Sequence, residues 1–170
     1  MRIAFRITAS LLDAVRADLA RPHPFALERV GFLACRFGAL RPRGLVIVAS
    51  DYCPVADEYY LDAAGYGALM GPAAIRAALE HAYNHPVGMF HVHVHAHRGA
   101  PALSAIDVRE TARFVPDFFH VRPDMPHGAI VLSLNSACGR AWLPTTRRPT
   151  AIRDFAVVGT PMRFVGRSNG

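Results

Sequence analysis

Lysine is absent from this chain of 170 residues, so all 19 of its basic side chains are arginines. A genome rich in G and C favours arginine codons and gives one explanation. Another is that an enzyme acting on lysine-linked conjugates gains from having no lysine of its own to be modified. The arginines are scattered without interleaved aromatic residues, and 13 acidic residues reduce the formal net charge to +6. This pattern predicts no nucleic-acid partner.

Cysteines and long apolar runs are also scarce. Cys35, Cys53 and Cys138 are odd in number and far apart, which is typical of free thiols in a reducing compartment rather than of a disulfide framework. No apolar run approaches the ~20 residues of a transmembrane helix. Charged residues interrupt the N-terminal stretch where a secretory signal would need a continuous apolar core. We therefore expect a cytoplasmic protein without a membrane partner.

The composition, 52% hydrophobic and 19% charged, is that of a folded domain rather than a disordered chain. We expect a single domain over residues 1–166 and a flexible tail over residues 167–170. Alternating or apolar runs predict strands at 2–7, 26–37, 45–49, 128–134 and 138–143, and one last edge strand within 152–164. Helices are predicted after Ser10, Pro72 and Ser104, and 117–126 is expected to be irregular. The mixture predicts an α/β fold (α+β type) with a curved mixed β-sheet flanked by helices.

Four histidines, His91, His93, His95 and His97, follow one another at two-residue spacing. In an extended strand, alternate side chains point to the same face, so the four imidazoles are expected to lie along one side of one strand. Such a run can also be an adventitious metal tract or the remains of a tag. A tag would be contiguous and terminal, whereas this run is internal. A metal site is therefore the favoured interpretation.

A turn follows the histidines, and then Ser104 and Asp107. Ser104 is placed to cap a helix, with Asp107 on the first turn of that helix. Two histidines from a strand end and one carboxylate from the next helix form a His₂Asp set. Three protein ligands with a fourth position open to water are the composition of a catalytic zinc site. We therefore predict a bound Zn²⁺.

A hydrolytic zinc site also needs a general base and a group that stabilises an oxyanion. Glu28 is the best candidate for the base, because it stands at the entrance to an apolar strand, where a charge is costly. The alternative for Glu28 is an ordinary surface charge at a strand edge. The Ser104 hydroxyl can donate a hydrogen bond to an oxyanion while its oxygen caps the helix. No Gly-x-Ser-x-Gly motif surrounds Ser104, which argues against a serine nucleophile.

The order of these residues resembles the JAMM motif of the JAB/MPN metalloproteases. In that family a glutamate on an early strand is followed by His-x-His-Pro, about seven further residues and Ser-x-x-Asp. Here Glu28 precedes Gly31-Phe32-Leu33, Gly88-Met89-Phe90 leads into the histidines, and Ser104-x-x-Asp107 follows. The resemblance implies a JAB/MPN-like domain in which two histidines and Asp107 bind zinc. It also implies that Glu28 is the general base and that Ser104 stabilises the oxyanion.

The choice of the histidine pair depends on how this motif is aligned. His95 and His97 leave six residues before Ser104, one fewer than the usual pattern, whereas His93 and His95 leave eight. The proline of the family motif is missing in both alignments, and the turn residues after His97 suit the first. We therefore predict His95, His97 and Asp107 as the metal ligands, with His93, His95 and Asp107 as the alternative register.

The late segments 126–133, 139–142 and 157–162 look like those of bacterial JAB-domain proteins. Those proteins are associated with ubiquitin-like proteins and with E1-like and E2-like enzymes, in gene clusters of which some resemble antiviral defence systems. The implied function is a zinc metalloprotease or isopeptidase that cleaves the bond at the C-terminus of a ubiquitin-like protein. Two alternatives stay open. One is a non-catalytic MPN-type scaffold that binds partners, and the other is a hydrolase of a small amide or a sulfur-carrier adduct.

Overall fold

The structure is a computed structural model that describes residues 1–22, 26–62, 67–159 and 163–167. Within these residues the chain forms one nine-stranded sheet. The strands are β1 (Arg2–Thr8), β2 (Val30–Leu40), β3 (Gly44–Pro54), β4 (Gly88–Val94), β5 (His127–Leu132), β6 (Ala137–Trp142), β7 (Pro149–Ala151), β8 (Asp154–Val158) and β9 (Arg163–Arg167). The helices are α1 (Ala9–Leu19), α2 (Pro72–Asn84), α3 (Ala105–Phe114) and α4 (Phe118–Val121), with short 3₁₀ turns η1 (Asp57–Tyr59) and η2 (Val115–Asp117).

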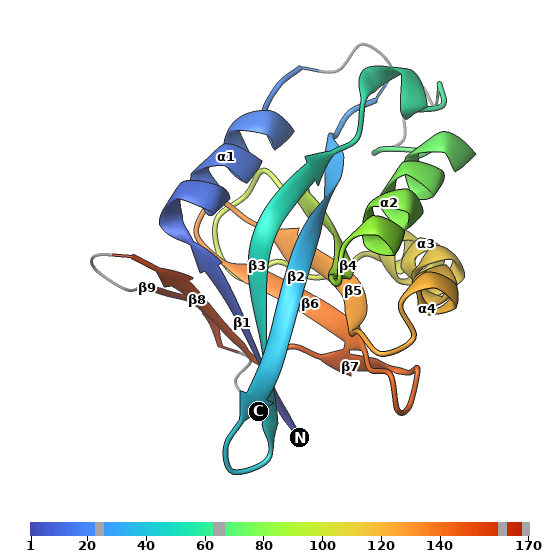
Figure 1. Ribbon diagram of the computed structural model, residues 1–170. Coiled ribbons are helices and arrows are strands. Elements are labelled where there is room, and N and C mark those ends of the chain that lie inside the picture. Colours follow the sequence, from blue (N-terminus) through green and yellow to red (C-terminus); the bar gives the residue numbers. More distant parts are fainter. Residues whose placement is uncertain (23–25, 63–66, 160–162, 168–170) are drawn as a thin grey trace.

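The sheet has the order β7-β6-β5-β4-β2-β3-β1-β8-β9 and mixes parallel with antiparallel pairs. Strand β4 lies between β2, to which it is antiparallel, and β5, to which it is parallel. Strand β1 lies between β3 and β8 and is parallel to both. Figure 1 shows a curled sheet with α1 on one side and α2, α3 and α4 on the other. This architecture confirms the predicted fold class, an α/β fold (α+β type) with a curved mixed sheet flanked by helices.

Alternation along β4 sorts its residues between two buried layers. Phe90 and Val92 point into the hydrophobic cluster that three apolar residues of α1 complete. Met89 belongs to the second cluster, which contains three alanines of α2 and a phenylalanine of α4. Because residues two apart in a strand share a face, His91 and His93 lie on the same side as Met89. The strand therefore delivers its histidines to the layer of α2, α3 and α4.

Two local expectations are wrong. The first helix is capped by Thr8 rather than by Ser10, because the Thr8 hydroxyl oxygen accepts a hydrogen bond from the Leu11 N–H at 3.2 Å. The helix therefore begins at Ala9, two residues earlier than a Ser10 cap would allow. The segment 117–126, expected to be irregular, contains α4. This short helix owes its order to packing, since both of its phenylalanines are buried.

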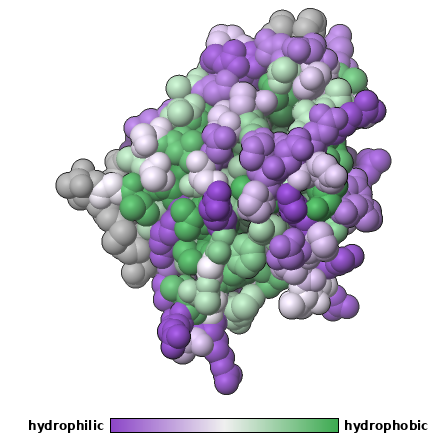
Figure 2. All heavy atoms as spheres, viewed as in Figure 1, coloured by the Kyte–Doolittle hydropathy of each residue, from purple (hydrophilic) through white to green (hydrophobic). Residues whose placement is uncertain are grey.

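The C-terminal region also differs from the expectation. Residues 152–164 do not form a single edge strand: β8 is an inner strand that pairs with β1, and β9 lies outside it at the edge. Arg167 is the last residue of β9, and the rest of the expected tail, 168–170, lies outside the described residues. No helix in the described part of the chain is long and apolar enough to cross a membrane. Figure 2 shows a face on which polar side chains surround apolar surface over the lower halves of β2 and β3.

Candidate metal centre

The position of the histidines follows from the hydrogen bonding of β4. In the register of the sheet, His93 lies opposite Val30 of β2 and opposite Val131 of β5. Being paired on both sides, the strand has no freedom to turn these side chains to the other face. Beyond the end of β4, the N–H of His95 donates to the Leu132 carbonyl at 2.8 Å. The pairing with β5 therefore extends to His95 and keeps its ring on the side of His93.

Asp107 reaches the histidines because of the way α3 begins. Ser104 is the N-cap of this helix, and its hydroxyl oxygen accepts a hydrogen bond from the Asp107 N–H at 3.1 Å. In return Oδ2 of Asp107 accepts from the Ser104 N–H at 2.7 Å. This reciprocal arrangement is a capping box, here with aspartate in the position that glutamate usually occupies. The predicted helix cap and the first-turn position of Asp107 are both confirmed.

Three side chains converge at this point. Nε2 of His93 lies 3.2 Å from Nε2 of His95 and 3.4 Å from Oδ1 of Asp107. Nε2 of His95 lies 4.0 Å from Oδ2 of Asp107. Ligand atoms about 2.05 Å from a tetrahedral zinc ion would be about 3.3 Å apart, so two of these separations fit such an ion without rearrangement. His93, His95 and Asp107 can therefore hold a metal ion.

His97, the other histidine of the predicted pair, does not join this group. It is exposed, and its Nδ1–H donates to the Arg98 carbonyl at 3.0 Å. Its ring centroid lies 6.0 Å from that of His95, so it remains next to the group without converging on it. Among the described residues, the set with ligand spacing is the alternative register, His93 with His95, rather than the preferred pair, His95 with His97.

His91 lies one step deeper along the same face and is a packing residue. Its ring makes edge contacts with Phe32 and Phe114, at centroid distances of 5.7 and 5.6 Å. Burial, together with the neighbouring His93 ring, lowers the pKa of His91 to about 3. His91 is therefore uncharged near neutral pH and packs beside His93, with a centroid distance of 5.5 Å between the two rings.

The electrostatics of the group favour an anionic ligand at Asp107. Partial burial acts to raise the pKa of Asp107, but the contact with His93 and the hydrogen bonds from Ser104 outweigh it and hold the pKa below its ordinary range.

Binding of a metal at Nε2 of His93 requires the imidazole proton on Nδ1. That atom is buried and has no hydrogen-bond partner among the residues that the structure describes. Metal-binding histidines usually donate this second N–H to a partner. His93 lacks that support, so it would bind a metal ion less firmly than the histidines of most such sites.

Glu28 lies two residues before β2 and is half-buried. Val30, the first residue of β2, pairs with His93, so Glu28 precedes the strand at the end of the sheet where the histidines lie. Glu28 is not one of the three side chains with ligand spacing. Ser104 is exposed, and its hydroxyl hydrogen is not used by the helix cap.

Two neighbours of Glu28 were not predicted from the sequence. Arg29 is only 4% exposed and is bound by Asp57, and Gly67 lies directly against the Glu28 carboxylate. Arg29 could have been found from the sequence, because a charged residue directly before an apolar strand needs a partner. Gly67 could not, because its contact with Glu28 joins residues far apart in the sequence.

Comparison with known proteins adds no assignment to this geometry. No protein-family model matches the chain, and no curated protein matches it.

Proposed function

We propose that this protein is a zinc-dependent metalloprotease or isopeptidase with a JAB/MPN-like fold. Its substrate in this proposal is the peptide or isopeptide bond at the C-terminus of a ubiquitin-like protein. The observation that carries the proposal is the convergence of two imidazole nitrogens and one carboxylate, His93, His95 and Asp107, at the end of β4 where Glu28 and Ser104 also lie. E1-like and E2-like proteins, and a role in antiviral defence, belong to the same proposal through the sequence resemblance alone.

The residues present divide the chemistry among them. Zn²⁺ in a site of two histidines and one aspartate supplies Lewis acidity, which lowers the pKa of water to about 7 and polarises a carbonyl group. Glu28 accepts the proton of the attacking water and later gives it to the leaving amine. The Ser104 hydroxyl donates to the carbonyl oxygen as negative charge develops there. Asp107 stays ionised because of its contacts with His93 and Ser104.

Exposed apolar side chains flank the group on three different segments. Leu27 precedes Glu28 and is 75% exposed, Ile106 precedes Asp107 and is 51% exposed, and Leu134 is 52% exposed. Leu134 is tied to the histidine segment, because its N–H donates to the His97 carbonyl at 2.9 Å. Exposed apolar side chains on segments next to a polar site are suited to binding an extended protein tail rather than a small polar amide.

The test is cleavage by the zinc-loaded protein of two substrates. One is a ubiquitin-like protein fused through its C-terminal tail to a second protein, and the other is the tail peptide alone with a fluorogenic amide. We expect cleavage of the fusion, and a loss of roughly 10²- to 10⁴-fold in Glu28→Gln, which removes the proton carrier but no metal ligand. Glu110→Gln is the matched control, since Glu110 lies on α3 and is paired with Arg109 and Arg113.

Two results would contradict the proposal. Absence of cleavage of both substrates by zinc-loaded protein would leave the non-catalytic scaffold as the better account. Cleavage of the small amide but never of the fusion would instead favour a hydrolase of small amides or sulfur-carrier adducts. Equal rates for the parent protein and Glu28→Gln would remove Glu28 from the mechanism.

A further inference from the structure

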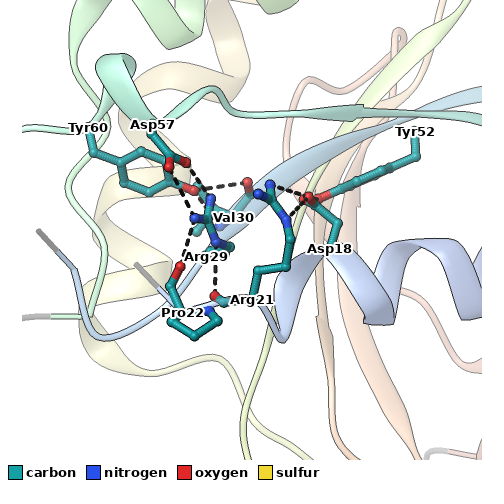
Figure 3. A network of polar contacts seen from close by, with 8 residues as sticks. All are labelled: Asp18, Arg21, Pro22, Arg29, Val30, Tyr52, Asp57 and Tyr60. Carbon is teal, nitrogen blue, oxygen red and sulfur yellow. Dashed lines mark hydrogen bonds and ion pairs between the residues drawn. The ribbon is translucent and has the colours of Figure 1, made fainter. Parts of the chain in front are cut away.

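The backbone on both sides of Glu28 is held by contacts from distant segments. Immediately after it, the Arg29 guanidinium is almost fully buried and uses its donors on three groups at once. Nη1 donates to Oδ1 of Asp57 at 2.6 Å, Nε to the Arg21 carbonyl at 2.9 Å, and Nη2 to the Pro22 carbonyl at 2.8 Å. Figure 3 shows Arg29 between the chain that leaves α1 and the turn η1 that carries Asp57.

One side chain, that of Tyr60, bonds both backbone groups of the next residue, Val30. The hydroxyl of Tyr60 accepts from the Val30 N–H at 2.8 Å and donates to the Val30 carbonyl at 3.2 Å. These two hydrogen bonds are made inside the protein, where a change of geometry cannot be compensated by water. The first residue of β2 therefore has little freedom to shift along the strand or rotate.

The carbonyl that Arg29 binds at Arg21 is itself held in place. The Arg21 guanidinium donates to Oδ1 of Asp18 at 2.5 and 2.8 Å, and Oδ2 of Asp18 accepts from the Tyr52 hydroxyl at 2.7 Å. Tyr52 lies over Gly31 of β2, where an added Cβ would come within 2.4 Å of its ring. Figure 3 shows that these contacts continue the network of Arg29 across α1 to β3.

On the other side of Glu28, Gly67 provides both a partner and space. Its carbonyl accepts from the N–H groups of Leu27 and Glu28, at 2.9 and 3.1 Å. A Cβ added to Gly67 would lie 3.2 Å from Oε2 and 3.4 Å from Cδ of Glu28. The carboxylate therefore packs against the glycine, and a side chain at this position would force it to shift by a few tenths of an ångström.

We propose that Arg29 and Gly67 are positioning residues for Glu28. The buried Arg29 guanidinium fixes the backbone next to Glu28, and the absence of a side chain at Gly67 leaves room for the Glu28 carboxylate. The inference rests on the proposed role of Glu28 as proton carrier. The ion pair alone does not account for Arg29, since its partner Asp57 is 48% exposed and such a pair contributes little to stability. A guanidinium instead holds three segments in one geometry through directional hydrogen bonds. That geometry determines the backbone position of Glu28, and with it the point from which the Glu28 side chain extends.

The decisive variant is Gly67→Ala, which presses on the Glu28 carboxylate and removes no contact of the fold. Its matched control is Gly38→Ala, in which the nearest atom to the new Cβ is a methyl carbon of Val46 at an ordinary 3.7 Å. Arg29→Lys is the second variant, since it keeps the charge but loses the fork that binds Asp57 and two carbonyls. Each protein is loaded with Zn²⁺ and compared by zinc content, by kcat and KM on the fusion substrate, and by the position of the Glu28 carboxylate in a crystal structure.

We expect all variants to keep their zinc. In Gly67→Ala the Glu28 carboxylate must move by a few tenths of an ångström. In Gly67→Ala and Arg29→Lys, kcat should fall roughly 3- to 10-fold with little change in KM, because a misplacement of about 1 Å costs roughly 100-fold. The Glu28 carboxylate should be displaced in both crystal structures, and Gly38→Ala should match the parent protein. A Gly67→Ala protein with an unmoved carboxylate or an unchanged kcat would overturn the inference. If the parent protein is inactive, the proposed function fails, and the carboxylate position still decides the question of positioning.

Discussion

Replacement of Ser104 by alanine separates the two roles assigned to that residue. The structural role is the helix cap, in which the Ser104 oxygen accepts from the Asp107 N–H at 3.1 Å. Loss of such a cap costs about 1 kcal/mol, or about 2–4 °C in Tm for a protein of this size. Zinc should be retained, because the bond from the Ser104 backbone N–H to Asp107 remains. The catalytic role is a hydrogen bond to the oxyanion, and loss of one such donor costs roughly 10²- to 10³-fold in kcat.

Thr8→Ala is the matched control for Ser104→Ala. Thr8 caps α1 with the same geometry, accepting from the Leu11 N–H at 3.2 Å, and α1 lies on the other side of the sheet from the metal group. Urea unfolding and steady-state kinetics should show similar losses of stability in both variants but a loss of kcat in Ser104→Ala alone. Equal activity in the two variants, whether both intact or both reduced, would refute the oxyanion role of Ser104.

Three further predictions concern stability. The buried His127 ring accepts from the Met89 N–H and donates to the Arg122 carbonyl, and burial lowers its pKa to about 4. The unfolded chain therefore binds this proton at higher pH than the folded protein, so the free energy of unfolding should fall by up to about 3 kcal/mol as the pH drops from about 6.5 to about 4. Urea titrations of His127→Asn should show a weaker dependence. Gly88→Ala should destabilise the fold by about 1–3 kcal/mol or more, measured by urea unfolding, because its Cβ would lie 2.0 Å from the Pro126 carbonyl oxygen. Chelation of zinc from protein saturated about 100-fold above Kd should remove about 2.7 kcal/mol of stability and lower Tm by about 5–10 °C in a calorimeter.

The sequence was sufficient to predict the elements that build the metal group. Two-residue spacing predicted correctly that His91 and His93 share a face, although β4 ends at Val94 and does not include His95 or His97. Ser-x-x-Asp predicted the helix cap that positions Asp107. Both are local rules, with periods set by the backbone of strands and helices.

The choice of the histidine pair could not be predicted in the same way. Counting residues back from Ser104 measures the length of a loop, but not the point at which the strand ends. That point is set by the bond from the His95 N–H to the Leu132 carbonyl, after which the His97 N–H turns back to the His95 carbonyl at 2.8 Å. The pairing of β4 with β5 joins residues almost forty positions apart in the sequence. Spacing alone carries no information about it.

The helix α4 illustrates the same limit in the fold. Four residues have almost no intrinsic tendency to form a helix. Phe118 is instead held by tertiary contacts, packing edge-on to Phe32 at 6.0 Å and stacking on His127 at 5.3 Å. The periodicity of apolar residues in the sequence does not reveal packing of this kind.

The most direct test of the metal centre is the zinc content of purified protein, measured by elemental analysis beside single alanine variants. We expect one zinc per chain, lost in His93→Ala, His95→Ala and Asp107→Ala and retained in His97→Ala. Retention in His93→Ala with loss in His97→Ala would restore the other histidine pair. A parent protein that takes up no zinc even after loading would contradict the metal centre itself.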